Sequence, residues 1–259
     1  ILSRELKEAI KGYLRATFPL TTPFFHGLVD RFLEEEGKLF KGPYISVNLP
    51  FVRSPQAQNF FSDISLDFPP YLHQKLAWDR VSAPNPRPTI IATGTGSGKT
   101  ECFLLRILQH CIEQKRRGKG GIKAILLYPM NALASDQARR IAKLISEKPA
   151  LFNSGLRAGI YIGGYSDKSE DRLVKVMSKD SIINDRETLR TAPPDILLTN
   201  YKMLDYMLIR KEDLNLWAQQ EPETLQYLVV DELHTFDGAQ GTALSCLIRR
   251  LKNRLQTPK

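Results

Sequence analysis

The sequence predicts an α/β fold in which a mainly parallel β-sheet is flanked by helices on both faces. Short apolar segments of strand length recur along the chain, and helical stretches follow most of them. These segments are 89–92, 122–128, 156–162, 195–199 and 227–231. Apolar strands separated by helices pair in parallel through right-handed crossovers. A glycine-rich turn follows the first segment and an acidic pair closes the last, at the sheet edge where such folds bind ligands.

Two of the connecting helices show apolar stripes at helical spacing, and each stripe is expected to face the sheet. One consists of Ala134, Ala138, Ile141, Ala142 and Ile145, and the other of Leu244, Leu247, Ile248 and Leu251.

The first 60 residues predict a small helical appendage and a Pro-rich linker, and residues 61–259 predict the α/β domain. Leu6, Ile10, Tyr13 and Leu14 fall on one helical face, and a second amphipathic stretch follows Pro23. Between positions 37 and 70, five prolines are scattered among aromatic residues. This composition indicates a segment wrapped over the surface of the core.

The composition excludes several classes of protein. The chain has 259 residues, of which 42% are apolar, but no apolar stretch approaches the length of a membrane helix, and the first residues lack the apolar segment of a signal peptide. Its three cysteines show no Cys-x-x-Cys spacing, so neither a zinc cage nor a disulfide framework is indicated, and a reducing, cytoplasmic setting is favoured. Because the chain does not begin with methionine, we interpret it as a piece of a longer protein.

The formal net charge of +9 is concentrated in one part of the chain. Residues 101–150 contain ten Lys and Arg against four Asp and Glu, and a localised excess of this kind favours a polyanionic partner. The alternative is a solvated basic face with a basic loop at 115–121, which needs no partner.

The glycine-rich turn has the composition of a loop that binds a nucleoside triphosphate. Gly94, Gly96 and Gly98 allow backbone N–H groups to face phosphate oxygens, and Lys99 reaches the β and γ phosphates. The hydroxyl of Thr100 is placed to bind magnesium.

The acidic pair at the end of the last apolar segment supplies a second magnesium ligand and a base for hydrolysis. Asp231 is predicted to hold the same ion, and Glu232 is the candidate base for the attacking water. The strict loop pattern has glycine where this chain has Thr93, so the loop is a variant. Two alternative interpretations involve no nucleotide: the loop is a turn that binds no ligand, and the acidic pair only caps the end of a strand.

Thr93-Gly94-Thr95-Gly96-Ser97-Gly98-Lys99-Thr100, together with Asp231-Glu232-Leu233-His234, resembles motifs I and II of superfamily 2 helicases of the DExH type. In that family the first loop position is often Ala or Thr. The resemblance implies a RecA-like P-loop NTPase domain that uses ATP and magnesium. It implies catalytic roles for Lys99, Asp231 and Glu232, a coupling role for His234, and nucleotide contacts from Gln74, Thr95, Gly96, Ser97, Gly98, Lys99 and Thr100. Residues 71–74 look like the adenine-recognising segment of the family, in which Gln74 would contact the base.

Three further segments resemble the nucleic-acid-binding motifs of the same family, in the expected order. Residues 128–133 resemble motif Ia, Gly163-Gly164 the glycine pair that approaches the bound strand, and residues 199–204 motif Ib. The resemblance implies contacts with the sugar-phosphate backbone by Pro129, Asn131, Gly163, Gly164, Thr199 and Asn200. Each segment follows a predicted strand, which agrees with a common binding edge. Gly163-Gly164 as a plain turn and Asn200 as a helix cap are the alternatives.

At a finer level, residues 128–134, 231–241 and 41–44 resemble large prokaryotic DNA helicases that carry a C-terminal domain of unknown function. Members often belong to antiphage defence systems such as DISARM or Druantia. This likeness implies DNA as the partner, a second RecA-like domain elsewhere in the protein, and possible defence-system subunits.

Family members also need a motif III and arginines from the second RecA-like domain, and this chain contains neither in the expected order. Arginine fingers contribute about a thousandfold or more to turnover. We therefore expect the 259 residues alone to hydrolyse ATP weakly.

The leading hypothesis is the first motor domain of an ATP-driven DNA helicase or translocase. A DExH RNA helicase, an ATP-dependent nucleic-acid clamp without unwinding activity, and a small-molecule phosphotransferase are the alternatives. Competition between DNA and RNA strands would separate the first two, and strand displacement would separate a motor from a clamp.

Overall fold

The computed structural model describes residues 2–20, 22–35, 37, 49–82, 86–94, 96–163 and 173–256. Within the chain two compact units are distinguished, Ile1–Pro50 and Phe51–Lys259. Thr95, Gly164 and the segment 41–44, all named above, lie outside the described residues.

The first unit contains the two helices that the sequence predicts. They are α1 (Leu2–Thr17) and α2 (Leu28–Glu34), with a 3-10 turn η1 (Pro23–Phe25) before α2. Ion pairs join them: Lys11 contacts Glu34 over 2.9 Å, and Arg15 contacts Asp30 over 2.6 Å. The helices therefore associate through charged side chains on their facing sides.

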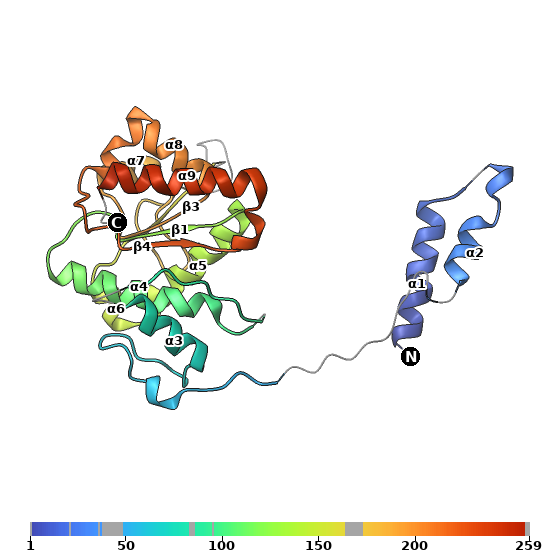
Figure 1. Cartoon of the computed structure of the whole chain (residues 1–259), viewed down its shortest axis with the longest axis horizontal. Helices are drawn as coiled ribbons and strands as arrows, with labels where there is room; N and C mark the ends of the chain where they lie inside the picture. Colours follow the sequence, from blue (N-terminus) through green and yellow to red (C-terminus); the bar gives the residue numbers. More distant parts are fainter. Residues whose placement is uncertain are drawn as a thin grey trace. The chain divides into compact units, whose positions relative to one another are not determined.

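The second unit is built on a four-stranded parallel sheet with the order β2-β3-β1-β4, which confirms the predicted fold class (Figure 1). Its strands are β1 (Ala124–Leu127), β2 (Ala158–Tyr161), β3 (Ile196–Thr199) and β4 (Tyr227–Val230). Each lies inside an apolar segment that the sequence identified as a strand.

The carboxyl ends of all four strands are in register. Leu127 lies opposite both Thr199 and Val230, and Thr199 lies opposite Tyr161. The residues that follow these four positions therefore meet at one edge of the sheet, as the sequence analysis expects.

Helices cover both faces of the sheet (Figure 1). One layer consists of α3 (Leu72–Val81), α4 (Lys99–Arg116), α5 (Asn131–Glu147) and α6 (Pro149–Asn153). The other consists of α7 (Arg186–Thr191), α8 (Tyr201–Ile209) and α9 (Gly238–Leu255). Shorter 3-10 turns are η2 (Pro55–Ala57), η3 (Lys211–Trp217) and η4 (Leu233–Thr235). In β1, Ala124 and Leu126 pack into the first layer while Ile125 and Leu127 pack into the second, as strand alternation requires.

The strand predicted at 89–92 is wrong. This segment is extended but pairs with no strand of the described chain, and the side chain of Ile90 is 81% exposed. A strand needs a neighbour that exchanges backbone hydrogen bonds with it. In the described sheet β4 pairs only with β1, so the other edge of β4 has no strand partner and 89–92 is not part of the ladder.

Residues 51–60, which the sequence analysis groups with the linker, pack with the second unit. The Ser54 N–H donates to the Pro70 carbonyl over 2.7 Å, and the Leu72 N–H donates to the Val52 carbonyl over 2.8 Å. Phe60 also packs against Trp78, with ring centroids 5.2 Å apart. The short antiparallel pairing of 51–54 with 70–72 places this segment beside the start of α3.

Within the part of the chain that the structure describes, no helix has both the length and the apolar character needed to cross a membrane.

Candidate functional site

The glycine-rich turn forms a compact loop that ends at the start of α4. Gly96 and Gly98 have positive φ angles of 75° and 74°, a conformation that favours glycine. A Cβ atom on Gly98 would also lie 2.5 Å from Nε2 of Gln74. The backbone conformation therefore favours glycine at position 98, where a side chain would also displace the Gln74 amide, and α4 begins there without a side-chain cap. Its first N–H groups are free of any capping side chain, as anion binding requires.

Two neighbouring side chains of α3 hold the carbonyl groups of this loop. Nε2 of His73 lies 3.0 Å from the Ser97 carbonyl oxygen, and Nε2 of Gln74 donates to the Gly98 carbonyl over 3.2 Å. Oε1 of Gln74 accepts a hydrogen bond from the Tyr71 N–H over 2.8 Å. Gln74 is buried, so here its amide serves the protein backbone, and the predicted contact with adenine stays a prediction.

The structure explains the threonine at the variant loop position. The Thr93 hydroxyl lies 2.5 Å from that of Ser97, and Nζ of Lys99 donates to the Thr93 carbonyl over 3.3 Å. The hydroxyl closes the loop across its base, a contact that glycine cannot make. Lys99 is exposed and folded back onto its own loop, with no other side chain holding its ammonium group among the described contacts.

The acidic pair directly follows β4. The Asp231 N–H continues the sheet by donating to the Leu127 carbonyl over 2.9 Å. Glu232 has a positive φ of 50°, which is shared by only one other non-glycine residue in the described ranges. Its carboxylate lies 3.3 Å from Nδ1 of His234. Left-handed backbone at a residue with a side chain costs energy and often marks a functional position.

Charged groups connect the loop with the acidic pair. Arg140 on α5 forms an ion pair with Glu101 in the first turn of α4. Burial, followed by the Asp231 charge, raises the pKa of Tyr128 above its ordinary value, and the charge of Arg140 opposes this effect. The ion pair thus joins the first turn of α4, which follows the loop, to α5, and the charges of Arg140 and Asp231 both act on Tyr128.

The side chains at this edge suit magnesium that is bound together with a triphosphate. Thr100 offers a hydroxyl and Asp231 a carboxylate, and hard oxygen donors of this kind are what Mg²⁺ prefers. No cluster of three or more His, Cys, Asp or Glu residues with metal-binding geometry occurs in the described chain. The remaining ligands would therefore come from phosphate oxygens and water.

The residues predicted to contact nucleic acid lie together at the same edge. Nδ2 of Asn200 donates to Oδ1 of Asn131 over 2.8 Å, and Nδ2 of Asn131 donates to the Gly163 carbonyl over 3.2 Å. Oδ1 of Asn200 also accepts from the Met203 N–H over 2.8 Å and so caps α8. We call Asn131, Gly163 and Asn200 the asparagine clip, because it joins the segments that follow β1, β2 and β3.

Thr199 and Pro129 occupy different positions relative to the clip. Thr199 is fully buried, and its hydroxyl donates to the Tyr161 carbonyl over 2.5 Å, which ties β3 to β2. Its side chain therefore faces the sheet rather than the surface. Pro129 is half-buried just before α5, next to the exposed Asn131.

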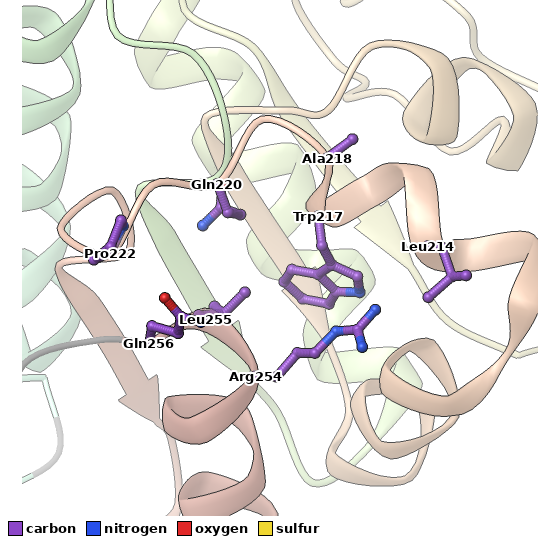
Figure 2. Close-up of a pocket in the computed structure, with 8 residues that line it drawn as sticks. All are labelled: Leu214, Trp217, Ala218, Gln220, Pro222, Arg254, Leu255 and Gln256. Carbon is purple, nitrogen blue, oxygen red and sulfur yellow. The ribbon is translucent and has the colours of Figure 1, made fainter.

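A cleft of about 350 Å³ is lined by other residues, among them Leu214, Trp217 and Arg254 (Figure 2). Figure 2 shows the Trp217 indole and the Arg254 side chain inside it, with Gln220 on one side. The Gln220 amide donates to the carbonyl of Ile122, which precedes β1, over 3.1 Å. The cleft thus lies at the amino-terminal edge of the sheet, opposite the edge that carries the loop and the acidic pair.

Sequence reasoning did not identify His73, Glu101 or Arg140 as site residues. His73 precedes the predicted Gln74, so its position was the only available signal. The contact between Glu101 and Arg140 joins residues that are far apart in the sequence, and no local pattern indicates it.

Comparison with known proteins finds helicases. A family model described as DEAD/DEAH box helicase matches residues 71–259. The Druantia protein DruE of Escherichia coli (strain UMEA 4076-1) is 27% identical, and the alignment covers 99% of this chain and 20% of DruE. The ATP-dependent helicase YprA of Bacillus subtilis (strain 168) is 30% identical over 70% of this chain and 20% of YprA.

A solved structure has a similar fold. The crystal structure of the DUF1998 helicase MrfA bound to DNA and AMPPNP matches with a TM-score of 0.52 and 26% identity, covering 73% of this chain and 22% of MrfA. The chain therefore spans about a fifth of the length of the relatives it matches.

Proposed function

The chain belongs to the DEAD/DEAH box helicase family, and we propose that it is the ATP-binding motor domain of a DNA helicase or translocase. In this proposal, hydrolysis of magnesium-bound ATP drives movement along DNA. The observation that carries it is the common sheet edge: the acidic pair and the asparagine clip follow strands that end in register there. The ion pair of Glu101 with Arg140 joins the first turn of α4, just after the phosphate loop, to α5, which begins at the same edge.

The loop and α4 bind the triphosphate in this proposal. Free N–H groups at the start of α4 face phosphate oxygens, and the Lys99 ammonium moves from the Thr93 carbonyl to the β and γ phosphates. Thr100 and Asp231 hold magnesium, which when bound neutralises charge that develops on the phosphates.

Glu232 supplies the base for hydrolysis. Its carboxylate takes a proton from the attacking water while the water oxygen bonds to the γ phosphorus, and the bond to the bridging oxygen breaks to give ADP and phosphate. In this proposal the coupling residue is His234, whose Nδ1 lies 3.3 Å from the Glu232 carboxylate. A change at His234 can therefore alter the position of the catalytic carboxylate.

DNA is the proposed partner because the asparagine clip lies among polar backbone and amide groups that suit sugar-phosphate contacts, and because the structure of a similar helicase contains DNA. MrfA was solved bound to DNA, and DruE is a Druantia protein. We further propose a cytoplasmic role in prokaryotic phage defence, together with a second RecA-like domain and defence-system subunits.

The proposal is tested in the full-length protein by measuring ATP hydrolysis with DNA or RNA strands of equal length and sequence. Wild-type protein is expected to show turnover stimulated more by DNA. Lys99→Ala should lose ATP binding, whereas Glu232→Gln should retain ATP binding and lose turnover by about a hundredfold or more.

Strand displacement on a partial duplex separates a motor from a clamp. Wild-type protein should displace the strand with ATP, and Glu232→Gln should bind the duplex without displacing it. Stronger stimulation by RNA would favour the RNA helicase, and DNA-stimulated hydrolysis without displacement or translocation would favour the clamp. Equal turnover by wild type and Glu232→Gln would refute the assigned base.

A further inference from the structure

We infer that His73 is a positioning residue for ATP binding, because it fixes the orientation of a peptide group in the phosphate loop. The inference rests on the proposed function, since it concerns the same nucleotide site. It adds a residue outside the loop and outside the acidic pair.

The contact itself is direct. Nε2 of His73 lies 3.0 Å from the carbonyl oxygen of Ser97. A carbonyl oxygen can only accept, so the histidine must carry a proton on Nε2 and donate it. The imidazole is half-buried at the start of α3, while Ser97 is 1% exposed inside the loop.

Holding this carbonyl also orients an N–H group. The carbonyl of Ser97 and the N–H of Gly98 belong to one planar trans peptide group and point in opposite directions. When His73 draws the carbonyl toward α3, the Gly98 N–H turns away from α3. Gln74 acts in the same way on the next peptide group, since it binds the Gly98 carbonyl and thereby orients the Lys99 N–H.

Two aromatic rings hold the imidazole in place. His73 stacks on Tyr71 with ring centroids 5.6 Å apart and planes 14° apart, and it meets the edge of Phe51 at 5.5 Å. Phe51 reaches the loop as well, because its Cζ would lie 3.6 Å from a Cβ atom built on Gly94. The Leu72 N–H bond to the Val52 carbonyl keeps the segment of Phe51 next to α3.

Side chains outside the loop therefore fix the orientation of its peptide groups before any nucleotide binds. A donor that already points toward its ligand loses less entropy and less reorganisation energy on binding. Because the N–H groups contact phosphates in both substrate and transition state, losing this orientation should weaken ATP binding and leave kcat largely unchanged.

Two variants of the full-length protein separate the hydrogen bond from the ring stacking. His73→Phe keeps an aromatic ring but removes the donor, whereas His73→Gln removes the ring but offers an amide N–H at a similar reach. We expect His73→Phe to raise the Kd and the KM for ATP about five- to tenfold with kcat within about twofold of wild type. His73→Gln should recover most of the affinity, and DNA binding without nucleotide should be the same in all three proteins.

Several outcomes would overturn the inference. These are wild-type ATP affinity in His73→Phe, equal weakening in His73→Gln, or a fall in kcat matched by a loss of thermal stability. The Lys99→Ala variant distinguishes a failure of this inference from a failure of the proposed function. If wild type binds ATP and Lys99→Ala does not, an unaffected His73→Phe refutes only the role of His73. If wild type binds no ATP, the proposed function and this inference fail together.

Discussion

The side-chain amides of Asn200 and Asn131 are hydrogen-bonded to each other over 2.8 Å, and this bond joins the start of α8 to the start of α5. Asn131 extends the connection to the Gly163 carbonyl. Two residues that the sequence predicts as direct contacts with nucleic acid thus also hold three loops together. Their amides position the surface on which the backbone N–H groups of α5 and α8 are presented.

The two roles of Asn200 can be separated by substitution. Asn200→Ser keeps a neutral side-chain oxygen that caps α8 but removes the donor to Asn131, whereas Asn200→Ala removes both. We expect Asn200→Ala to lower the free energy of unfolding by about 1 kcal/mol, and Asn200→Ser to lower it by a few tenths, in urea denaturation. Both should reduce affinity for single-stranded DNA several-fold, because both break the asparagine clip. If Asn200→Ser, which is nearly as stable as wild type, also binds DNA as wild type does, the clip has no role in DNA binding.

Arg140 is expected to neutralise Glu101 beside the phosphate loop. A carboxylate oxygen of Glu101 would lie 3.1 Å from a Cβ atom built on Gly98, so its charge is close to any bound triphosphate. Arg140→Ala leaves this charge unpaired, and repulsion should weaken ATP binding about tenfold at low salt. The double variant Arg140→Ala with Glu101→Gln should recover the affinity, as titration with ATP would show. No recovery would mean that Arg140 acts by some means other than this charge.

His110 should make the stability of the protein depend on pH. It lies on α4 against the ring of Tyr227, with centroids 5.3 Å apart, and burial together with the Arg106 charge lowers its pKa to about 4. In the unfolded chain a histidine pKa is about 6.5. The unfolded state therefore binds the proton first, so the contribution is complete above pH 6.5 and is lost as pH falls toward 4.

The pKa difference corresponds to about 3 kcal/mol across this window. His110→Phe keeps the ring contact but cannot take up a proton, so its unfolding free energy should fall less between pH 6.5 and 4 than that of wild type. Guanidinium denaturation at several pH values measures the difference. Parallel curves for the two proteins would contradict the assignment.

Asp195 is expected to be the most important charged residue for stability. It is buried before β3, where its carboxylate lies 2.8 Å from Nζ of Lys123 and accepts the Arg157 N–H over 2.8 Å. Asp195→Ala leaves the buried Lys123 without its partner and should cost about 3–5 kcal/mol. Asp67→Ala is the matched control, because Asp67 is 70% exposed in its pair with Lys148 and should cost less than about 1 kcal/mol. Similar losses in both variants would refute the importance of burial.

Several elements of the fold and site follow from local sequence. The apolar segments predict all four strands of the sheet, and the periodic stripes predict α5 and α9. The glycines of the loop and the acidic pair after β4 predict which residues form a nucleotide site without any knowledge of their contacts, and these roles stay predictions. These predictions succeed because strand alternation, helical periodicity and turn composition are properties of neighbouring residues.

The segment 89–92 shows where local sequence is insufficient. Its apolar composition suits a strand, yet it pairs with no described strand, because pairing depends on which elements lie beside it after folding. Thr199 shows the same limit for side chains. Its place in a motif suggested a surface contact, but the position of β2 beside β3 buries its hydroxyl.

By itself, the sequence determined the order and type of the elements, the loop that suits a triphosphate and the acidic residues that suit its magnesium. Only the tertiary structure decided that His73 holds the Ser97 carbonyl, that Arg140 pairs with Glu101 and that Asn131 bonds Asn200. The physical reason is that each of these contacts joins residues separated by one or more crossovers of the sheet or by a turn between helices. Their partners are chosen by how the layers pack, and no periodicity along the chain records that choice.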